Sequence, residues 1–470
     1  MSLSRLLDAR VAGLAPDARR LLAIVSTAGS PLAQDVAADA ADVPDPRAAL
    51  AMLRFQRLVR ARGLSDHDAV ESYHDRIREH VVRTMPDDER ASCHRRLAIS
   101  LDKHGSEDPE RLAEHWLLAG DAEKAGDLYE HAAHRAAQAL AFDRAARLYA
   151  RAAERPGLRR ARLELLESRR GEALANAGRG TEAAAAFLSA ATYADTDRAL
   201  ELRRLAGERL LAAGHVDQGL EVLREVLREL DLWMPSSPQL ALLSFLVRRA
   251  ELGVRGLEFR EKTPEEVKKR DRLRIDTCWA LTVGLNGVDM MRGADFAARS
   301  LLLSLRAGDP FRIGRALAFE TTSTAFVGTT NEARADALAK SLLELADRLN
   351  DPHLLGFGHL VTGMCDAFTR GRWTSALEHY AKAEKVFRDE CRGVSWEVDT
   401  TDMVTSWSLF YTGRLRELSA RLPATLKAAE QRRDLYAQAN LTTSHAWVML
   451  ARGDIEAARA QPALVMARWS

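Results

Sequence analysis

The sequence predicts a mainly α-helical protein in which a long α-solenoid of helical hairpins follows a small domain that also contains strands. Three observations lead to this fold class. Aromatic residues make up only 6% of the 470-residue chain, and Ala, Leu and Arg are frequent, a mixture that favours helix over strand. A glycine pattern returns at a nearly constant spacing in the second half of the chain. The first 104 residues lack that pattern and contain two short extended runs.

The first 104 residues combine helices with a β-hairpin. Apolar spacing and helix-start residues such as Ser30-Pro31 and Asp45-Pro46 predict helices over 4–14, 16–27, 31–38, 46–55 and 75–84. Two extended runs, 58–63 and 69–74, flank a polar turn at 65–68 and predict the hairpin. Three helices followed by a hairpin are the element order of a winged helix, so we expect a winged-helix domain over residues 1–104.

A repeat begins near residue 107, and no convincing strand follows. In each instance a small residue and a Gly end one helix, and an Ala-rich amphipathic helix follows at once. Glycine can adopt the left-handed conformation that ends a helix and lets the next one fold back beside it. The glycines concerned are Gly120, Gly178, Gly214, Gly328, Gly371, Gly413 and Gly453, of which the last four lie 40 to 43 residues apart.

A second signal marks the start of each hairpin. Asp309-Pro310 and Asp351-Pro352 lie 42 residues apart, and Asp434 follows about two periods later. Asp is a favoured N-cap and Pro is favoured in the first helical turn. A period of roughly 34 to 45 residues with two helices per unit is typical of a tetratricopeptide-like α-solenoid.

Breaks in the repeat suggest the domain boundaries. The segment Met234-Pro235-Ser236-Ser237-Pro238 interrupts the array, and the charged stretch 258–274 is a second break that we interpret as a solvated helix face. We therefore expect repeat blocks over 105–233 and 275–470, separated by a linker with irregular helices over 234–274. A helix predicted over 455–469 has no cap after it, so we expect the second block to be truncated at the C-terminus.

Charge and hydropathy limit the classes of partner that we expect this chain to bind. The net charge of +1 gives no global attraction to nucleic acid or to anionic membranes. The longest apolar run, 240–247, is too short to span a bilayer, and the N-terminus has no signal-peptide pattern. Cys93, Cys278, Cys365 and Cys391 form no CxxC pair, which fits a reducing cytoplasm. We expect protein partners, no membrane and no nucleic acid, and an oligomer is compatible with the sequence.

The sequence contains no complete catalytic motif. It has no GxxxxGK[ST] loop, no GxSxG and no HExxH, and His74-Asp75-Arg76 is the nearest string to a kinase catalytic loop. We therefore predict that this chain is not an enzyme and holds no cofactor. His131 and His134 share a helix face and could hold a metal, but no third ligand lies nearby, so we expect no metal site and a polar repeat face there.

Two groups of residues are candidates for binding. Arg54, Arg57, Arg60 and Arg62 cluster where a winged helix places its last helix and its hairpin, and could contact phosphates. The alternative is a solvated face, paired with nearby acidic residues. Four tryptophans of the C-terminal repeats could line a concave pocket, or could only pack helices together. They are Trp373, Trp396, Trp407 and Trp447.

The N-terminal segment resembles the winged-helix domain that follows the nucleotide-binding core in STAND ATPases, the signal-transduction ATPases with numerous domains. The similar strings are Leu14-Ala15-Pro16-Asp17-Ala18-Arg19-Arg20-Leu21-Leu22, Tyr73-His74-Asp75-Arg76-Ile77-Arg78-Glu79 and Glu89 through Ala98. In that family the segment passes into repeats of the kind seen here from Ala113-Glu114-His115-Trp116 through Tyr149.

The remaining chain resembles the C-terminal arm of large bacterial serine/threonine protein kinases that carry an AAA-type ATPase module and tetratricopeptide repeats. The resemblance covers nearly all of the chain, but its motifs are packing motifs, and the kinase domain and the ATPase core are both absent from this sequence. ATP and Mg²⁺ are therefore expected only in a missing upstream module. The resemblance also implies that His74 contacts the nucleotide-binding core, against the alternative that it only caps the helix beside Asp75.

Three functions remain open. The leading hypothesis is a non-catalytic regulatory or scaffold arm of a signalling ATPase or kinase, which binds protein partners or a small inducer through its repeats. A second is a fragment or subunit of a multidomain serine/threonine kinase with an ATPase module. A third is a transcriptional regulator of the STAND class, whose winged helix touches DNA.

Overall fold

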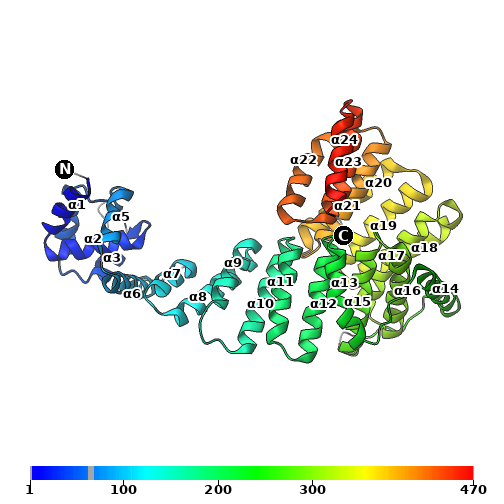
Figure 1. The fold of residues 1–470 in the computed structure, drawn as a ribbon, viewed down its shortest axis with the longest axis horizontal. Helices are drawn as coiled ribbons and strands as arrows, with labels where there is room; N and C mark the ends of the chain where they lie inside the picture. Colours follow the sequence, from blue (N-terminus) through cyan, green and yellow to red (C-terminus); the bar gives the residue numbers. More distant parts are fainter. Residues whose placement is uncertain (1–2, 62–67, 107, 264, 469–470) are drawn as a thin grey trace. The chain divides into compact units, whose positions relative to one another are not determined.

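The computed structural model describes residues 3–61, 68–106, 108–263 and 265–468. It contains three short strands near the N-terminus and a long succession of helices, labelled α1 to α24 (Figure 1). These helices pack as consecutive hairpins, so the predicted mainly α solenoid is confirmed. The chain forms two compact units, residues 1–159 and residues 160–470. No helix in the described ranges has the length and apolar character needed to cross a bilayer.

The first part of unit 1 contains the sheet. Its strands pair antiparallel in the order β1-β3-β2, with Leu32 and Ala61 both opposite Val70. The core lies under the sheet on α2, where Leu21, Leu22 and Ile24 are buried. In chain order the elements are α1 (Leu3–Ala12), α2 (Pro16–Ala28), β1 (Leu32–Ala33), α3 (Gln34–Ala41), α4 (Pro46–Phe55), β2 (Val59–Ala61), β3 (Ala69–Ser72), α5 (Asp75–Thr84) and α6 (Asp87–Lys103).

The predicted hairpin corresponds to β2 and β3, while residues 65–67 of its turn lie outside the described residues. The predicted helix over 31–38 is present but begins later than predicted, because residues 32–33 form a strand and the helix runs over Gln34–Ala41. Leu32 pairs with Val70 as a third strand, and the Gln34 N–H donates to the Asp68 carbonyl oxygen over 3.1 Å. Helix α3 therefore starts at Gln34, because strand pairing outweighs the local Ser30-Pro31 start signal. A three-stranded sheet among these helices is compatible with a winged helix.

Helical hairpins begin within unit 1. Helix α6 packs on α7 (Pro109–Leu118), which pairs with α8 (Ala122–Gln138), and α9 (Phe142–Ala153) packs on α8. His94 of α6 and His115 of α7 are both buried, and their Nδ1 atoms are 2.9 Å apart. Burial lowers the pKa of each imidazole to about 4, so both rings are neutral at physiological pH.

Unit 2 consists of fifteen α-helices within the described residues, most of them in antiparallel pairs (Figure 1). They are α10 (Arg160–Asn176), α11 (Gly180–Tyr193), α12 (Thr196–Ala212), α13 (Val216–Glu229), α14 (Pro238–Arg255), α15 (Lys269–Leu285), α16 (Met290–Ala307), α17 (Pro310–Phe326), α18 (Glu332–Leu349), α19 (Pro352–Met364), α20 (Trp373–Glu390), α21 (Ser395–Tyr411), α22 (Leu415–Arg432), α23 (Leu435–Ala451) and α24 (Ile455–Met466). A π-helical turn (Cys365–Thr369) extends α19, and a 3-10 turn (Thr329–Asn331) precedes α18.

The predicted helix boundaries in the repeats are confirmed. Every glycine named above has a positive φ, for example 65° at Gly371 and 71° at Gly413. The side chains of Asp309, Asp351 and Asp434 each accept a hydrogen bond, of 2.9 to 3.1 Å, from an N–H in the first turn of the helix that follows. These caps satisfy backbone donors that would otherwise lack a partner at each helix start.

One helix departs from the hairpin pattern. Helix α14 lies within the segment predicted as a linker, and it packs mainly on α16. Only Ala241 and Leu252 of this helix are buried. The predicted domain boundaries at 104, 233 and 274 are not decided by this placement, and they stay predictions.

Two turns that are distant in sequence meet within unit 2. The Leu435 N–H donates to the Ala213 carbonyl oxygen over 2.9 Å, and the Arg209 guanidinium donates to the Gly393 carbonyl oxygen over 3.3 Å. We call this junction between the α12–α13 turn and the start of α23 the closing contact. The array of hairpins therefore curves until the start of unit 2 touches its later hairpins.

Candidate ligand-binding site

A cavity of about 240 Å³ lies on the inner face of unit 2. Its walls come from α15, α17, α19, α21 and α23, which are the first helices of five consecutive hairpins. Each hairpin presents its first helix to the same side, so one face of the array carries all five. We call this hollow the inner-face cavity.

Aromatic side chains make much of the cavity wall. Phe319, Phe357 and Trp396 line it from three helices. Trp279 lies behind them and is 5% exposed. Its ring meets those of Phe319, Phe357 and Trp396 edge-on, with centroids 5.7, 5.9 and 6.4 Å away. Edge-to-face packing of this kind fixes ring orientation, so the wall is preformed.

Three polar residues of the lining, Thr400, Tyr436 and Asn440, come from the neighbouring helices α21 and α23. The Tyr436 and Thr400 hydroxyls are 3.0 Å apart, and the Asn440 amide donates to the Tyr436 carbonyl oxygen over 2.9 Å. Burial raises the pKa of the Tyr436 phenol, which therefore stays uncharged. This polar edge lies between α21 and α23, while the walls from α17 and α19 are mainly apolar.

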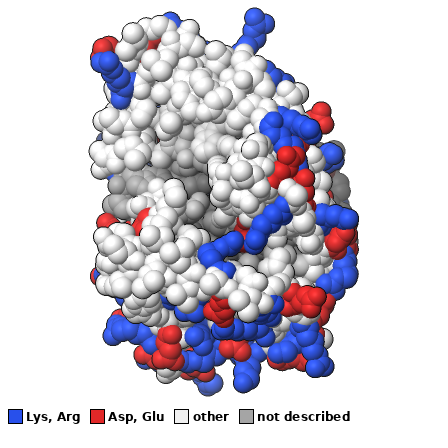
Figure 2. All heavy atoms as spheres, turned by 90° about the vertical axis from the view of Figure 1, so that its right-hand side faces the viewer, with Lys and Arg blue, Asp and Glu red and all other residues white. Residues whose placement is uncertain are grey.

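The charged side chains of α21 face away from the cavity. Glu397 pairs with His353 over 2.9 Å, and Asp399 accepts from the Arg432 guanidinium at 2.7 and 3.0 Å. Burial, together with the nearby charge of Asp434, raises the pKa of Asp399 well above its ordinary value. None of the described lining residues is charged. Figure 2 shows a face with a hollow toward its left side, bordered mainly by uncharged side chains, while most of the charged side chains on this face lie below and to the right.

A buried ion network joins Asp276 of α15 to two arginines of α17. Asp276 accepts from Arg312 and from Arg315, over 2.5 and 2.6 Å. Burial alone would raise the pKa of Asp276, but Arg315, Arg204 and Arg312 outweigh it and hold that pKa below its ordinary value. The Arg315 guanidinium also lies 4.5 Å from the centroid of the Trp279 ring. The network therefore supports the ring that supports the cavity wall.

The predicted tryptophans divide into two pairs. Trp396 and Trp407 line the inner-face cavity. Trp373 stacks on Tyr411 with ring centroids 4.5 Å apart, and Trp447 stacks on Phe410 at 4.4 Å, so these two rings pack neighbouring helices. Sequence reasoning missed Phe319, Phe357, Met364, Thr400 and Tyr436. Their positions on the first helix of each hairpin were the available signal.

The candidate residues of unit 1 lie on separate elements. Arg54 is on α4, Arg57 follows that helix with a φ of 54°, and Arg60 on β2 forms a 2.9 Å ion pair with Glu71. Arg62 lies outside the described residues. His74 is the N-cap of α5, and its Nδ1 accepts a hydrogen bond from the Arg76 N–H over 3.2 Å.

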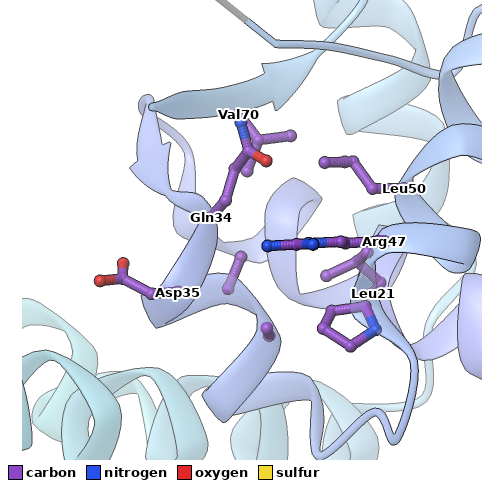
Figure 3. Close-up of a pocket in the computed structure, with 9 residues that line it drawn as sticks. Leu21, Gln34, Asp35, Arg47, Leu50 and Val70 are labelled. Carbon is purple, nitrogen blue, oxygen red and sulfur yellow. The ribbon is translucent and has the colours of Figure 1, made fainter. Parts of the chain in front are cut away.

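Unit 1 has a second cavity, of about 230 Å³, between α2, α3, α4 and β3 (Figure 3). Leu21, Leu50 and Val70 give it an apolar lining, and Arg47 extends across it below Gln34. The Gln34 Nε2 atom is buried and has no hydrogen-bond partner among the described residues. The hollow opens to the surface at the exposed Arg47, and its lining includes two charged side chains, Asp35 and Arg47.

The described residues contain no group of three or more His, Cys, Asp and Glu side chains placed to hold a metal ion. His131 and His134 are both exposed on α8, where His134 Nε2 lies 3.0 Å from the Gln138 amide nitrogen. The neighbours of His134 are those of an ordinary polar helix face.

Comparisons with known proteins add little. No family model matches the chain. Curated proteins likewise give no match. Among solved structures, the chain is similar to the crystal structure of a signal transduction ATPase with numerous domains (STAND) protein with a tetratricopeptide repeat sensor from Pyrococcus horikoshii. The identity is 15% and the TM-score 0.37, with all of this chain covered. The chain spans about 65% of the length of that protein's chain. At this level the similarity says nothing about function.

Proposed function

We propose that this chain is a non-catalytic regulatory arm of a signalling ATPase or kinase, and that unit 2 senses a ligand in its inner-face cavity. The observation that carries the proposal is the cavity itself, which is formed jointly by the first helices of five hairpins. A ligand that touches all five favours one curvature of the array over others. It can therefore shift the population of conformations that a neighbouring module experiences.

A regulatory role also agrees with the chemistry of the lining. Nucleophilic and acid–base catalysis need activated or titratable groups. The described lining residues offer hydroxyls, amides, thioethers and aromatic rings, and none is charged. The sequence adds neither a phosphate-binding loop nor a kinase catalytic loop. We assign any nucleotide chemistry, with its ATP and Mg²⁺, to an upstream module in a cytoplasmic, bacterial signalling protein.

Helix α14 offers a surface for a protein partner. Leu243, Leu246, Val247 and Val254 are spaced to share one helix face, and between 54% and 93% of each side chain is exposed. Exposed apolar stripes of this kind commonly mark protein–protein interaction sites. The second sequence hypothesis, a subunit of a multidomain kinase, gives the arm the same role. The DNA-binding hypothesis gains no support from Arg60, whose charge is paired with Glu71.

The test of the sensing role uses a matched pair of variants. Thr322 is half-buried in the cavity wall on α17, and its neighbour Ser323 is exposed outside it. Thr322→Trp fills the cavity, whereas Ser323→Trp adds the same side chain to the surface. We expect ligands found in a thermal-shift screen to stabilise the native chain and the Ser323→Trp variant but not Thr322→Trp.

Two results would overturn the proposal. One is that every stabilising ligand acts equally on both Trp variants, which would place binding elsewhere. The other is micromolar, stoichiometric binding of Mg-ATP to the chain in a calorimetric titration, because a regulatory arm without a phosphate-binding loop should give no specific heat.

A further inference from the structure

We propose, resting on the sensing function above, that the inner-face cavity takes an uncharged, flat, mainly apolar molecule of about two fused aromatic rings that carries one hydroxyl-sized polar group. Four properties of the cavity lead to this ligand class: the charge of its lining, its wall material, its volume and the position of its polar edge.

Charge excludes ionic ligands. None of the described lining residues carries a charge, and the acidic residues of α21 that lie nearby are engaged with other partners. Asp402 pairs with Arg421 and with Arg388, as Asp399 pairs with Arg432. A carboxylate or phosphate buried in this cavity would lose its hydration and gain no opposite charge. The ligand is therefore neutral.

The wall material suits a flat ring. Phe319 and Trp396 lie nearly parallel, at 15°, with centroids 6.5 Å apart. Met364 and Met403 complete the apolar wall from α19 and α21. Aromatic faces favour stacked or edge-on contact with another ring, and thioethers adapt to its outline. Sugars, which are hydroxylated all round, would bury polar groups against this wall without partners.

The volume of the cavity limits the size of the ligand. An apolar protein cavity of roughly 150 Å³ accommodates benzene. The inner-face cavity, at about 240 Å³, is about 1.6 times as large. Two fused six-membered rings are the natural match for that ratio, and a third ring would need the walls to move.

The polar edge of the cavity determines how the ligand is oriented. The Thr400 and Tyr436 hydroxyls are 3.0 Å apart, and Asn440 of α23 also lines the cavity. The Thr400 residue is 5% exposed, so its hydroxyl faces the protein interior and not bulk water. A ligand hydroxyl directed toward α23 meets donors and acceptors there, while its rings lie against α17 and α19.

The experiment titrates the full chain with 2-naphthol and 2-naphthoate, which share one ring system and differ in charge, by calorimetry at neutral pH. We expect 2-naphthol to bind with a stoichiometry of one. Binding of 2-naphthoate should be weaker by about a hundredfold, because its carboxylate finds no partner in the cavity.

A second matched pair tests the polar edge. Thr400→Val removes the hydroxyl at nearly constant volume and should weaken 2-naphthol binding about fivefold, as loss of one neutral hydrogen bond does. Thr401→Val is the control, because Thr401 donates to the Glu397 carbonyl oxygen within its own helix and does not line the cavity. Its affinity should equal that of the native chain.

The outcomes separate this inference from the function on which it rests. Equal or tighter binding of 2-naphthoate, or no binding of 2-naphthol at millimolar concentration, overturns the ligand class. Equal loss in the Thr400→Val and Thr401→Val variants overturns the orientation. In each case a different ligand that Thr322→Trp excludes and Ser323→Trp admits would still support the sensing role.

Discussion

Individual residues in this chain act mainly through backbone conformation and burial. Gly371 and Gly413 adopt left-handed conformations, and a Cβ built on either would meet no atom of the described residues within 4 Å. Gly214 is also left-handed, but a Cβ there would lie 2.7 Å from the Tyr436 nitrogen. The same sequence signal therefore marks two different requirements, and only the structure distinguishes them.

At Gly371 and Gly413 an added side chain meets no close neighbour among the described residues, so a substitution there should destabilise the protein through backbone strain alone. We expect Gly371→Val and Gly413→Val each to lower the free energy of unfolding by roughly 1 to 3 kcal/mol, since a β-branched residue is strained at positive φ. Denaturant unfolding measures the change. Unaltered midpoints in both variants would mean that these turns relax without cost and that the glycines do not fix the hairpin ends.

The buried His94–His115 pair should make unit 1 sensitive to acid. Both pKa values are lowered to about 4, from 6.5, so the unfolded chain binds more protons than the folded one between those pH values. Stability is therefore fully present above pH 6.5 and is lost as the pH falls toward 4, by on the order of several kcal/mol.

Two measurements made over a range of pH test this loss. Denaturant unfolding of the full chain gives the free energy of unfolding, and hydrogen exchange gives the protection of the amides in α6 and α7. His115→Gln keeps a hydrogen-bonding side chain but cannot titrate, so we expect its stability to vary less with pH. The attribution to this pair fails if native and variant chains lose protection in α6 and α7 over the same pH range.

At the scale of elements, the sequence predicts the helical hairpins well. It predicts poorly those features that depend on contacts between residues distant in sequence. Asp-Pro starts and glycine ends are local signals, and they locate α17 and α19 correctly. Strand β1 could not be predicted, because its two residues become a strand only by pairing with β3. Most of the cavity-lining residues could not be predicted for another reason. The sequence pattern of apolar residues on the first helix of a hairpin is the same whether they pack in a core or line a cavity. Trp396 and Trp407 were found because four tryptophans fall within residues 373–447 of the C-terminal repeats and stand out as a group.

Helix α24 should be the least protected helix of unit 2. Ala458 is its only described buried residue, and Ile455, Leu464 and Met466 are each more than half exposed. Pro462 also removes one backbone donor from the helix. Local stability follows buried contacts, so few contacts mean frequent opening.

Hydrogen exchange resolved by peptide tests this expectation. Amides in α24 should exchange about tenfold or more faster than those in α18, which has six buried residues. The comparison is made in dilute solution, so that association through the exposed apolar side chains does not protect α24. Equal rates there would show that burial does not govern protection in this array.

At the scale of the molecule, unit 2 is not a simple linear stack. Solenoid repeats normally contact only their neighbours, and their stability is then a sum of local terms. The closing contact adds a term between hairpins about 220 residues apart in sequence, through the bond from Leu435 to Ala213. Tyr436, the next residue, lines the cavity, so closure and the proposed site share one short segment.

This arrangement predicts that a destabilising substitution at Gly214 also affects a hairpin distant in sequence, whereas one at Gly371 affects only the neighbouring helices. Gly214→Val both strains the turn and pushes a side chain against the backbone of Tyr436, so it should open the closing contact. We expect faster amide exchange at the starts of both α13 and α23, and weaker binding of any cavity ligand, because Tyr436 loses its fixed position. Gly371→Val should speed exchange only around α19 and α20. If exchange in α23 is the same in the two variants, the closing contact contributes no coupling and unit 2 behaves as a linear array.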